Sequence, residues 1–101
     1  MANLGGKEVE VNEGGYVMHP EDWDKAVAGD LAKELGINLT DAHWKVVDYL
    51  REQHGQGIEM SIRKLGKSGI VDIKTLYELF PGGPLKYAAK IAGLHRPTSC
   101  V

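Results

Sequence analysis

The chemistry that this sequence could carry is concentrated in its last residues, LHRPTSCV. Cys100 is the only cysteine among 101 residues and stands beside the terminal Val101. Terminal segments are the part of a domain least often packed, so a thiol there suits reaching another molecule better than filling a core. The residues alone leave two interpretations open: a reactive thiol on an arm, and an incidental cysteine in an inert tail.

The charges near the thiol bear on its reactivity, because the reactive form of cysteine is the thiolate. We expect the adjacent terminal carboxylate to disfavour the thiolate of Cys100, and Lys90, His95 and Arg96 to offset that effect if the tail folds over them. An extended chain from Leu94 to Cys100 spans at most about 20–25 Å, at roughly 3.3–3.6 Å per residue. The thiol could therefore reach from its own domain into the pocket of a partner.

Charge is divided unevenly along the chain, whose net charge is −2. Residues 1–58 hold five Lys/Arg and eleven Asp/Glu, a net charge of −6, and residues 59–101 hold seven and three, a net charge of +4. A basic half can bind nucleic acid, or it can stabilise an anionic sulfur species. A solvated surface of mixed sign is the other interpretation of the same residues.

The sequence lacks the motifs that are typical of several classes of functional site. The histidines at 19, 43, 54 and 95 are scattered and one cysteine cannot pair, so we expect no metal site and no cofactor. The stretch GGKEVE at residues 5–10 lacks the spacing of a phosphate-binding loop, and no nucleophile-elbow motif is present. Without a long apolar run or a signal-peptide pattern, we expect a cytoplasmic protein with a reduced thiol.

The elements that must position the thiol are mostly helices. KEVEV, the turn residues NEGG and then YVM predict a β-hairpin over residues 7–18. Apolar spacing predicts helices over residues 19–36, 39–57, 59–67, 71–80 and 84–93. We expect Pro20 at a first helical position, Thr40 as an N-cap, and Gly36 and Gly93 at helix ends. The prediction is a small helical bundle that carries an N-terminal hairpin.

Apolar stripes on these helices predict the core. In chain order the stripes are Trp23, Val27, Leu31 and Leu35; Trp44, Val47, Leu50 and His54; Ile62 and Leu65; Ile73, Leu76, Tyr77 and Phe80; and Leu85, Ala88, Ala89 and Ala92. The aromatic residues Trp23, Trp44, Tyr77 and Phe80 are assigned to the core rather than to a functional site.

The two short helices between residues 59 and 80 have the spacing of a helix-turn-helix, a motif that could bind DNA. The second helix offers one base, Lys74, against Asp72 and Glu78, and a recognition helix usually offers more. Nucleic-acid binding is therefore the less favoured interpretation. It is kept as an alternative function, that of a regulatory protein with Cys100 as a sulfur sensor.

The C-terminal sequence LYELFPGGPLKYAAKIAGLHRPTSCV resembles the signature of the DsrC/TusE family of sulfur-relay proteins. That signature runs approximately L-Y-x-L-F-P-x-G-P, a short helix, and A-G-L-P-K-P-x-x-C-V/I. The matching residues are Leu76, Tyr77, Leu79, Phe80, Pro81, Gly83 and Pro84, and then Ala92, Gly93, Leu94, Pro97, Cys100 and Val101. Upstream, EDW at 21–23, HW at 43–44 and IR at 62–63 also match, so the resemblance covers essentially the whole chain.

The resemblance implies a mainly α fold: a small orthogonal helical bundle with a helix-turn-helix-like pair, an N-terminal β-hairpin and a mobile C-terminal arm. The domain would span residues 1–93 and the arm residues 94–101. It also implies that the penultimate cysteine carries sulfur, as a persulfide or in a mixed species with a partner. DsrC-type members serve as the gamma component of dissimilatory sulfite reductase, and TusE-type members pass sulfur toward tRNA thiolation.

By the same resemblance the chain would be a monomeric sulfurtransferase-type carrier rather than a stand-alone enzyme. Its donor would resemble TusBCD or DsrEFH, and its acceptor would be a tRNA thiolase or a sulfite reductase. Cys100 is the expected sulfur-carrying thiol. Arg63, Lys90, His95 and Arg96 are the candidates for an electropositive surface that receives the arm or a partner. Arg63 is chosen on a motif match, and the others on charge and proximity.

The chain departs from the family pattern at three places. DsrC-type members have a second cysteine eleven residues before the penultimate one, and here that position is Ala89, which rules out an internal disulfide. His95 stands where the signature has proline, adding a titratable ring beside the arm. The stretch from Arg63 to the LFP motif is about seven residues shorter than in many bacterial members. A role as a sulfite-reductase partner despite Ala89 is a further alternative.

Overall fold

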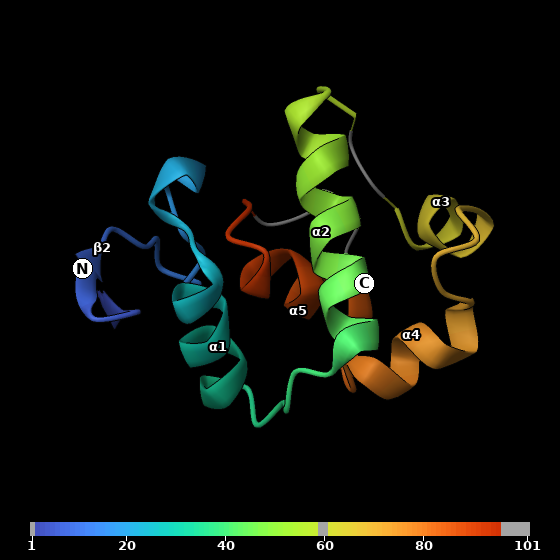
Figure 1. The fold of residues 1–101 in the computed structure, drawn as a ribbon, viewed down its shortest axis with the longest axis horizontal. Helices are drawn as coiled ribbons and strands as arrows, with labels where there is room; N and C mark the ends of the chain where they lie inside the picture. The colour runs from blue at the N-terminus through green and yellow to red at the C-terminus, as the bar shows by residue number, and fades with distance from the viewer. Residues whose placement is uncertain (1, 59–60, 96–101) are drawn as a thin grey trace.

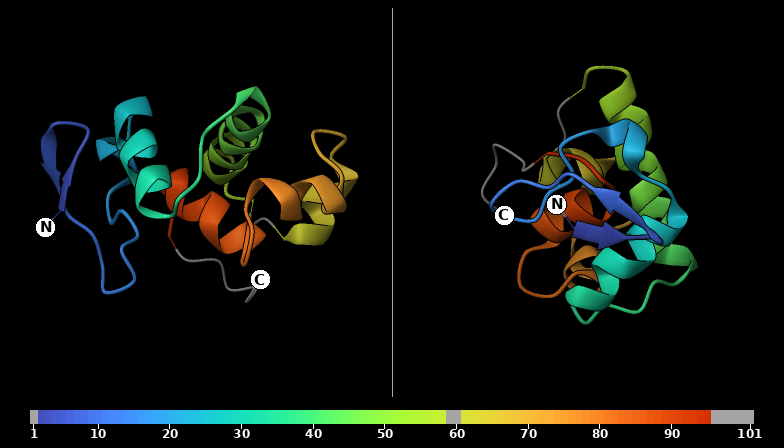
Figure 2. Two further views of the ribbon diagram at one scale, coloured as in Figure 1. Left: turned by 90° about the horizontal axis from the view of Figure 1, so that it is seen from below. Right: turned by 90° about the vertical axis from the view of Figure 1, so that its left-hand side faces the viewer.

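The last helix of the chain occupies the centre of the fold. In the computed structural model, which describes residues 2–58 and 61–95, helix α5 contacts α1, α2 and α4 (Figure 1). At one end of the molecule α3 packs on α4, and at the other the strand β1 packs on α1 (Figure 2). The elements are β1 (Ala2–Leu4), β2 (Lys7–Val9), the 3-10 turn η1 (Pro20–Asp22), α1 (Lys25–Glu34), α2 (Asp41–Gly55), α3 (Ile62–Lys67), α4 (Ile73–Leu79) and α5 (Pro84–Ile91). The predicted mainly helical fold with an N-terminal hairpin is confirmed.

Helix α5 suits its central place because its buried face is built from small and branched apolar residues. Pro84 opens the helix, and Leu85, Ala88, Ala89 and Ile91 are buried along it. Alanines allow the neighbouring helices to approach closely, and every buried methylene contributes about 0.8 kcal/mol of hydrophobic stabilisation. The predicted inner face of this helix is therefore confirmed.

The end of α5 has the geometry of a Schellman motif. Gly93 has φ +72°, its N–H donates to Lys90 O at 3.1 Å, and the N–H of Leu94 donates to Ala89 O at 3.0 Å. Leu94 is buried, which supplies the apolar contact that accompanies this motif. The predicted helix end at Gly93 is confirmed, and the first residue of the predicted arm packs in the core.

The first predicted helix begins later than its sequence suggests. Pro20 opens the 3-10 turn η1, Trp23 is extended with φ −78° and ψ 141°, and α1 starts only at Lys25. The reason is Asp24, whose Oδ1 accepts the N–H of Val27 at 2.9 Å and so caps the helix. The predicted end at Gly36, with φ +73°, is confirmed.

The cap at Asp24 makes a prediction about acid stability. The hydrogen bond from the Val27 N–H holds the pKa of Asp24 below its ordinary 3.8, helped by Lys7. A lowered folded pKa means that the stabilisation is present above about pH 4 and is lost as the pH falls through the folded pKa. Asp24→Asn keeps the cap but cannot titrate. We expect its melting temperature to fall less than that of the wild type from about pH 5 to about pH 2. Identical slopes in thermal unfolding would contradict this role.

The N-terminal sheet uses a different turn from the predicted one. Strands β1 and β2 pair antiparallel across Gly5 and Gly6, whose φ values of +61° and +80° fit a two-residue hairpin turn. The predicted NEGG turn is also present, but it closes a single bridge between Val11 and Val17. The sheet is held on α1 because Gly5 N–H donates to Asp30 Oδ2 at 2.7 Å.

On α2 the predicted stripe is confirmed at Val47 and Leu50, and the buried face is otherwise shifted toward the preceding residues. His43, Val46, Val47 and Leu50 are buried, whereas Trp44 is half-buried against the core and His54 is exposed. The predicted N-cap at Thr40 is confirmed, since α2 begins directly after it.

The cause of this shift is the position of the His43 ring. Its Nδ1 accepts the N–H of Thr40 at 3.1 Å, and its Nε2 lies 2.8 Å from Leu79 O. A carbonyl can only accept, so Nε2 carries the proton and the imidazole links the start of α2 to the end of α4. The ring also meets Phe80 edge-on, with centroids 5.1 Å apart.

Two residues of the predicted core on α4 are exposed instead. Leu76 and Phe80 are fully buried, but Ile73 is 45% exposed and Tyr77 46% exposed, so their assignment to the core is wrong. This short helix contacts α3 and α5 and lies at the edge of the bundle (Figure 1). Ile73 and Tyr77 are four residues apart, so they share one flank of α4, and that flank is the exposed one.

Candidate functional site

The part of the expected site that the structure describes is the root of the arm, residues 91–95. Cys100 and Arg96 lie outside the described residues. In Figure 1 the described end of the chain lies between α1 and α2. Those two helices and the segment that precedes α1 therefore determine where the arm leaves the domain.

Two side chains hold the root of the arm by its backbone carbonyls. Trp23 Nε1–H donates to Ile91 O at 2.7 Å, and Arg51 Nη1 donates to Ala92 O at 2.7 Å. These carbonyls belong to the last turn of α5, where no further helical N–H is available to them. We call Trp23, Arg51, Ile91 and Ala92 the arm-root cluster.

Arg51 also ties the cluster together internally. Its guanidinium carbon lies 4.1 Å from the centroid of the Trp23 ring, and Nη2 donates to Pro20 O at 3.2 Å. Burial lowers the pKa of Arg51, an effect that the carboxylate of Asp48 partly opposes. Arginine stays protonated in proteins, so a fixed positive charge stands at the negative end of the α5 dipole.

Gly93 fits this cluster because a side chain would not. A Cβ at this position would lie 2.4 Å from Trp23 Cδ1 and 2.7 Å from Trp23 Cγ. Its φ of +72° is also one that residues with a Cβ rarely adopt. Two physical reasons therefore favour glycine at this position of the AGL motif: the backbone conformation and the close packing against Trp23.

The predicted electropositive residues do not all gather at the arm root. His95 is exposed, and its ring centroid lies 5.6 Å from that of His54 on α2. Lys90 is half-buried in the last turn of α5, with its ammonium 5.9 Å from the centroid of the Tyr16 ring. Arg63 is exposed on α3, at the other end of the molecule from α1 (Figures 1 and 2). The structure thus brings Lys90 and His95 near the arm root and leaves Arg63 away from it.

Sequence reasoning missed Arg51 and assigned Trp23 to the core. Trp23 is half-buried and does pack on the core, but it also holds Ile91. The EDW motif match was the one sequence signal for it. Arg51 follows Val47 by four residues and so lies at the edge of the buried stripe of α2. It binds a carbonyl 41 residues away, which no local pattern indicates.

Ala89, which stands where DsrC-type members have their second cysteine, is buried at 5% exposure on the inner side of α5. Its place is therefore one of core packing in this chain. The α3–α4 pair has the predicted helix-turn-helix order, yet the exposed residues of α4 are Ile73, Lys74, Tyr77 and Glu78, with a single base among them.

Two kinds of feature are absent from the described part of the chain. No helix there is both long enough and apolar enough to cross a membrane. No group of three His, Cys, Asp or Glu side chains in residues 2–58 and 61–95 is placed to hold a metal ion.

Comparison with known proteins agrees with the fold and with the motif. The family model described as DsrC-like protein matches residues 3–101. The chain is 35% identical to the sulfurtransferase TusE of Sodalis glossinidius, over 95% of this chain and 96% of that one. It is 38% identical to the gamma subunit of dissimilatory-type sulfite reductase from Nitratidesulfovibrio vulgaris, over 95% and 93%. The solution structure of Allochromatium vinosum DsrC superposes with a TM-score of 0.82 at 38% identity, covering 99% of this chain and 96% of that one. The chain belongs to the DsrC-like family.

Proposed function

We propose that this protein is a sulfur-relay carrier that accepts sulfur on Cys100 and passes it to a partner. The observation that carries the proposal is the extent of the family match, which runs to residue 101 and so includes the chain's single thiol. Relatives that match over nearly their whole length are named as a sulfurtransferase and as a sulfite reductase subunit. A cytoplasmic location, inferred from the sequence, fits a relay whose thiol must stay reduced.

The chemistry needs no cofactor. The Cys100 thiolate attacks the outer sulfur of a donor persulfide, a new sulfur–sulfur bond forms on Cys100, and the donor's sulfur–sulfur bond breaks. The electron pair of the broken bond leaves on the donor thiolate, so no external oxidant or reductant is consumed. Attack by an acceptor thiolate on the outer sulfur of the Cys100 persulfide repeats the same exchange and regenerates the Cys100 thiolate.

In this proposal the described residues contribute by holding the start of the arm. Trp23 and Arg51 hold the carbonyls from which the arm starts. Lys90 and His95 are the candidates for an electropositive docking surface that lie nearest the arm. Arg96 and Arg63 are proposed for the same surface from the sequence alone. The partners we propose are a persulfide-bearing donor of the TusBCD or DsrEFH kind and an acceptor that is a tRNA thiolase or a sulfite reductase.

Two other functions remain as proposals of lower rank. A gamma-type role beside sulfite reductase is favoured by the relative from Nitratidesulfovibrio vulgaris, but Ala89 removes any cycle that needs two cysteines of one chain. Co-purification with reductase subunits would support that role. DNA binding through α3 and α4 is disfavoured by the single base on the exposed side of α4.

The test is intact mass after incubation with a cysteine desulfurase that carries a persulfide. We expect the protein to gain the mass of one sulfur atom and to lose it again under reductant. If several persulfide donors leave the mass unchanged while the thiol can still be alkylated, the relay proposal fails.

A further inference from the structure

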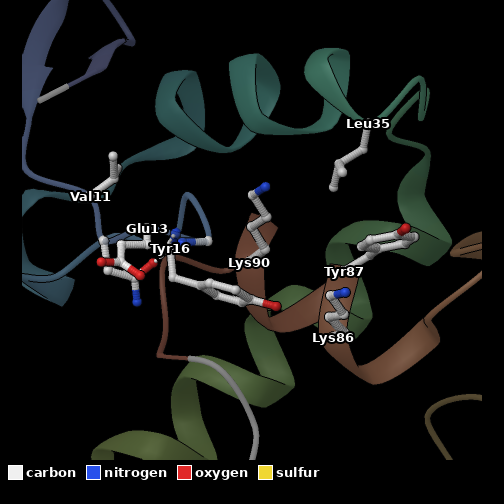
Figure 3. Close-up of a pocket in the computed structure, with 9 residues that line it drawn as sticks. Val11, Glu13, Tyr16, Leu35, Lys86, Tyr87 and Lys90 are labelled. Atoms are coloured by element: carbon white, nitrogen blue, oxygen red, sulfur yellow. Dashed lines mark hydrogen bonds between the residues drawn. The ribbon is translucent and has the colours of Figure 1, made fainter. Parts of the chain in front are cut away.

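An open groove of about 870 Å³ lies between α5, the end of α1 and the loop that follows β2 (Figure 3). Helix α5 contributes Lys86, Tyr87 and Lys90 to it. Leu35, at the end of α1, and Tyr16, beyond the loop, line the other sides. None of the comparisons and no part of the relay chemistry assigns a ligand to this groove.

The groove presents two lysines that have no carboxylate partner among residues 2–58 and 61–95. Lys86 and Lys90 are four residues apart and thus lie on one side of α5. Within the described residues the ion pairs are those of Lys7 and His19, so neither groove lysine is neutralised there. Each ammonium instead lies 5.9 Å from the centroid of a tyrosine ring, Lys86 from Tyr87 and Lys90 from Tyr16.

The walls of the groove are fixed and partly apolar. Asn12 Oδ1 accepts the N–H groups of Gly14 and Tyr16 at 2.9 and 3.1 Å, which closes the loop on itself. Those two backbone donors are therefore not available to cradle a phosphate. Leu35 and Tyr87 are half-buried and leave apolar surface open in the groove.

We propose that this groove is a docking surface for an acidic segment of a partner protein, with carboxylates that pair with Lys86 and Lys90 and an apolar side chain that packs on Leu35 and Tyr87. Charge complementarity favours an acidic ligand, and the apolar floor favours a polypeptide over a nucleic acid. Two lysines beside Glu13 are also a small charge for RNA, whose binding usually draws on many basic side chains along the phosphate backbone.

The groove lies close to the start of the arm, so a partner that docks there would be near the arm. Lys90 lies in the last turn of α5, directly before the arm-root cluster. A partner held by the two lysines would lie beside the place where the arm leaves the domain. That this partner is a sulfur donor or acceptor rests on the proposed function, whereas the preference of the groove for an acidic segment does not.

The first test is fluorescence anisotropy with a labelled peptide of glutamate and leucine residues. We expect the double variant Lys86→Glu/Lys90→Glu to weaken binding by about tenfold or more, and added salt to weaken wild-type binding. The matched control is Lys67→Glu/Lys74→Glu, which changes net charge equally on exposed residues of α3 and α4 and should bind like the wild type. A second variant, Leu35→Gln, should weaken binding without changing charge.

Three results would overturn the proposal. In the first, the wild type shows no salt-sensitive binding of the peptide. In the second, the groove variant and the control variant lose equal peptide affinity. In the third, a uridine-rich RNA oligonucleotide binds the wild type more tightly than the peptide does, and the groove variant abolishes this RNA binding. Loading of Cys100 by inorganic polysulfide separates this proposal from the relay function. We expect the groove variant to load at the wild-type rate. Failure of the wild type to load would count against the relay function and would leave the peptide result standing.

Discussion

Replacing Cys100 by serine is expected to abolish the donor-dependent gain of sulfur completely. A hydroxyl is not ionised near neutral pH and does not attack a persulfide, whereas a thiolate does. The sequence has no second cysteine, so no other thiol of the chain can take over. Intact mass after incubation with the persulfide donor measures the effect. Its control is thermal unfolding, which we expect to be unchanged because the arm lies beyond the α5 helix.

A second cysteine provides the matched variant for this experiment. Ala89→Cys restores the spacing of eleven residues to Cys100 that the family signature shows in DsrC-type members. We expect this variant to lose two hydrogen masses under mild oxidation, through an internal disulfide, while the wild type forms only reducible dimers. Sulfur gain by Cys100→Ser itself would mean that Cys100 is not the acceptor.

Gly93→Ala is expected to lower the free energy of unfolding by about 2–4 kcal/mol, from backbone strain at positive φ and the lost Trp23–Ile91 hydrogen bond. The added Cβ would lie 2.4 Å from Trp23 Cδ1, so the indole must move away from α5. In a domain of this size we expect the melting temperature to fall by about 10–25 °C.

Gly36→Ala is the control that separates strain from packing. Gly36 also has positive φ, +73°, at the end of α1, but a Cβ there would meet nothing within 4 Å. We expect it to cost about 1 kcal/mol, from the backbone alone. Equal losses in the two variants would mean that contact with Trp23 contributes nothing to holding the arm root.

The sequence predicts this fold well where local signals decide it. Gly36 and Gly93 end their helices as expected, and Thr40 precedes α2, because caps and helix ends depend on residues only a few positions apart. The turn at Gly5 and Gly6 could also have been predicted from local sequence, since a glycine pair between short extended runs favours a hairpin.

Long-range contacts explain what the sequence did not indicate. His43 turns inward and donates a hydrogen bond from Nε2–H to Leu79 O, 36 residues away, so that His43 rather than Trp44 is buried at the start of α2. Tyr77 is exposed because no element of the described residues covers that flank of α4, although its spacing is that of a core residue. Arg51 became recognisable as a positioning residue only once the carbonyl of Ala92 was placed beside it.

The central position of α5 has a consequence for the order of events during synthesis. The helix that α1, α2 and α4 all contact is the last one made, so these helices lack their common partner until residues 84–94 have been translated. The core can therefore close only after α5 has been made and has left the ribosome. A nascent chain halted before residue 84 holds α1, α2 and α4 without the helix on which all three pack. Folding of this domain is thus a late event of its synthesis.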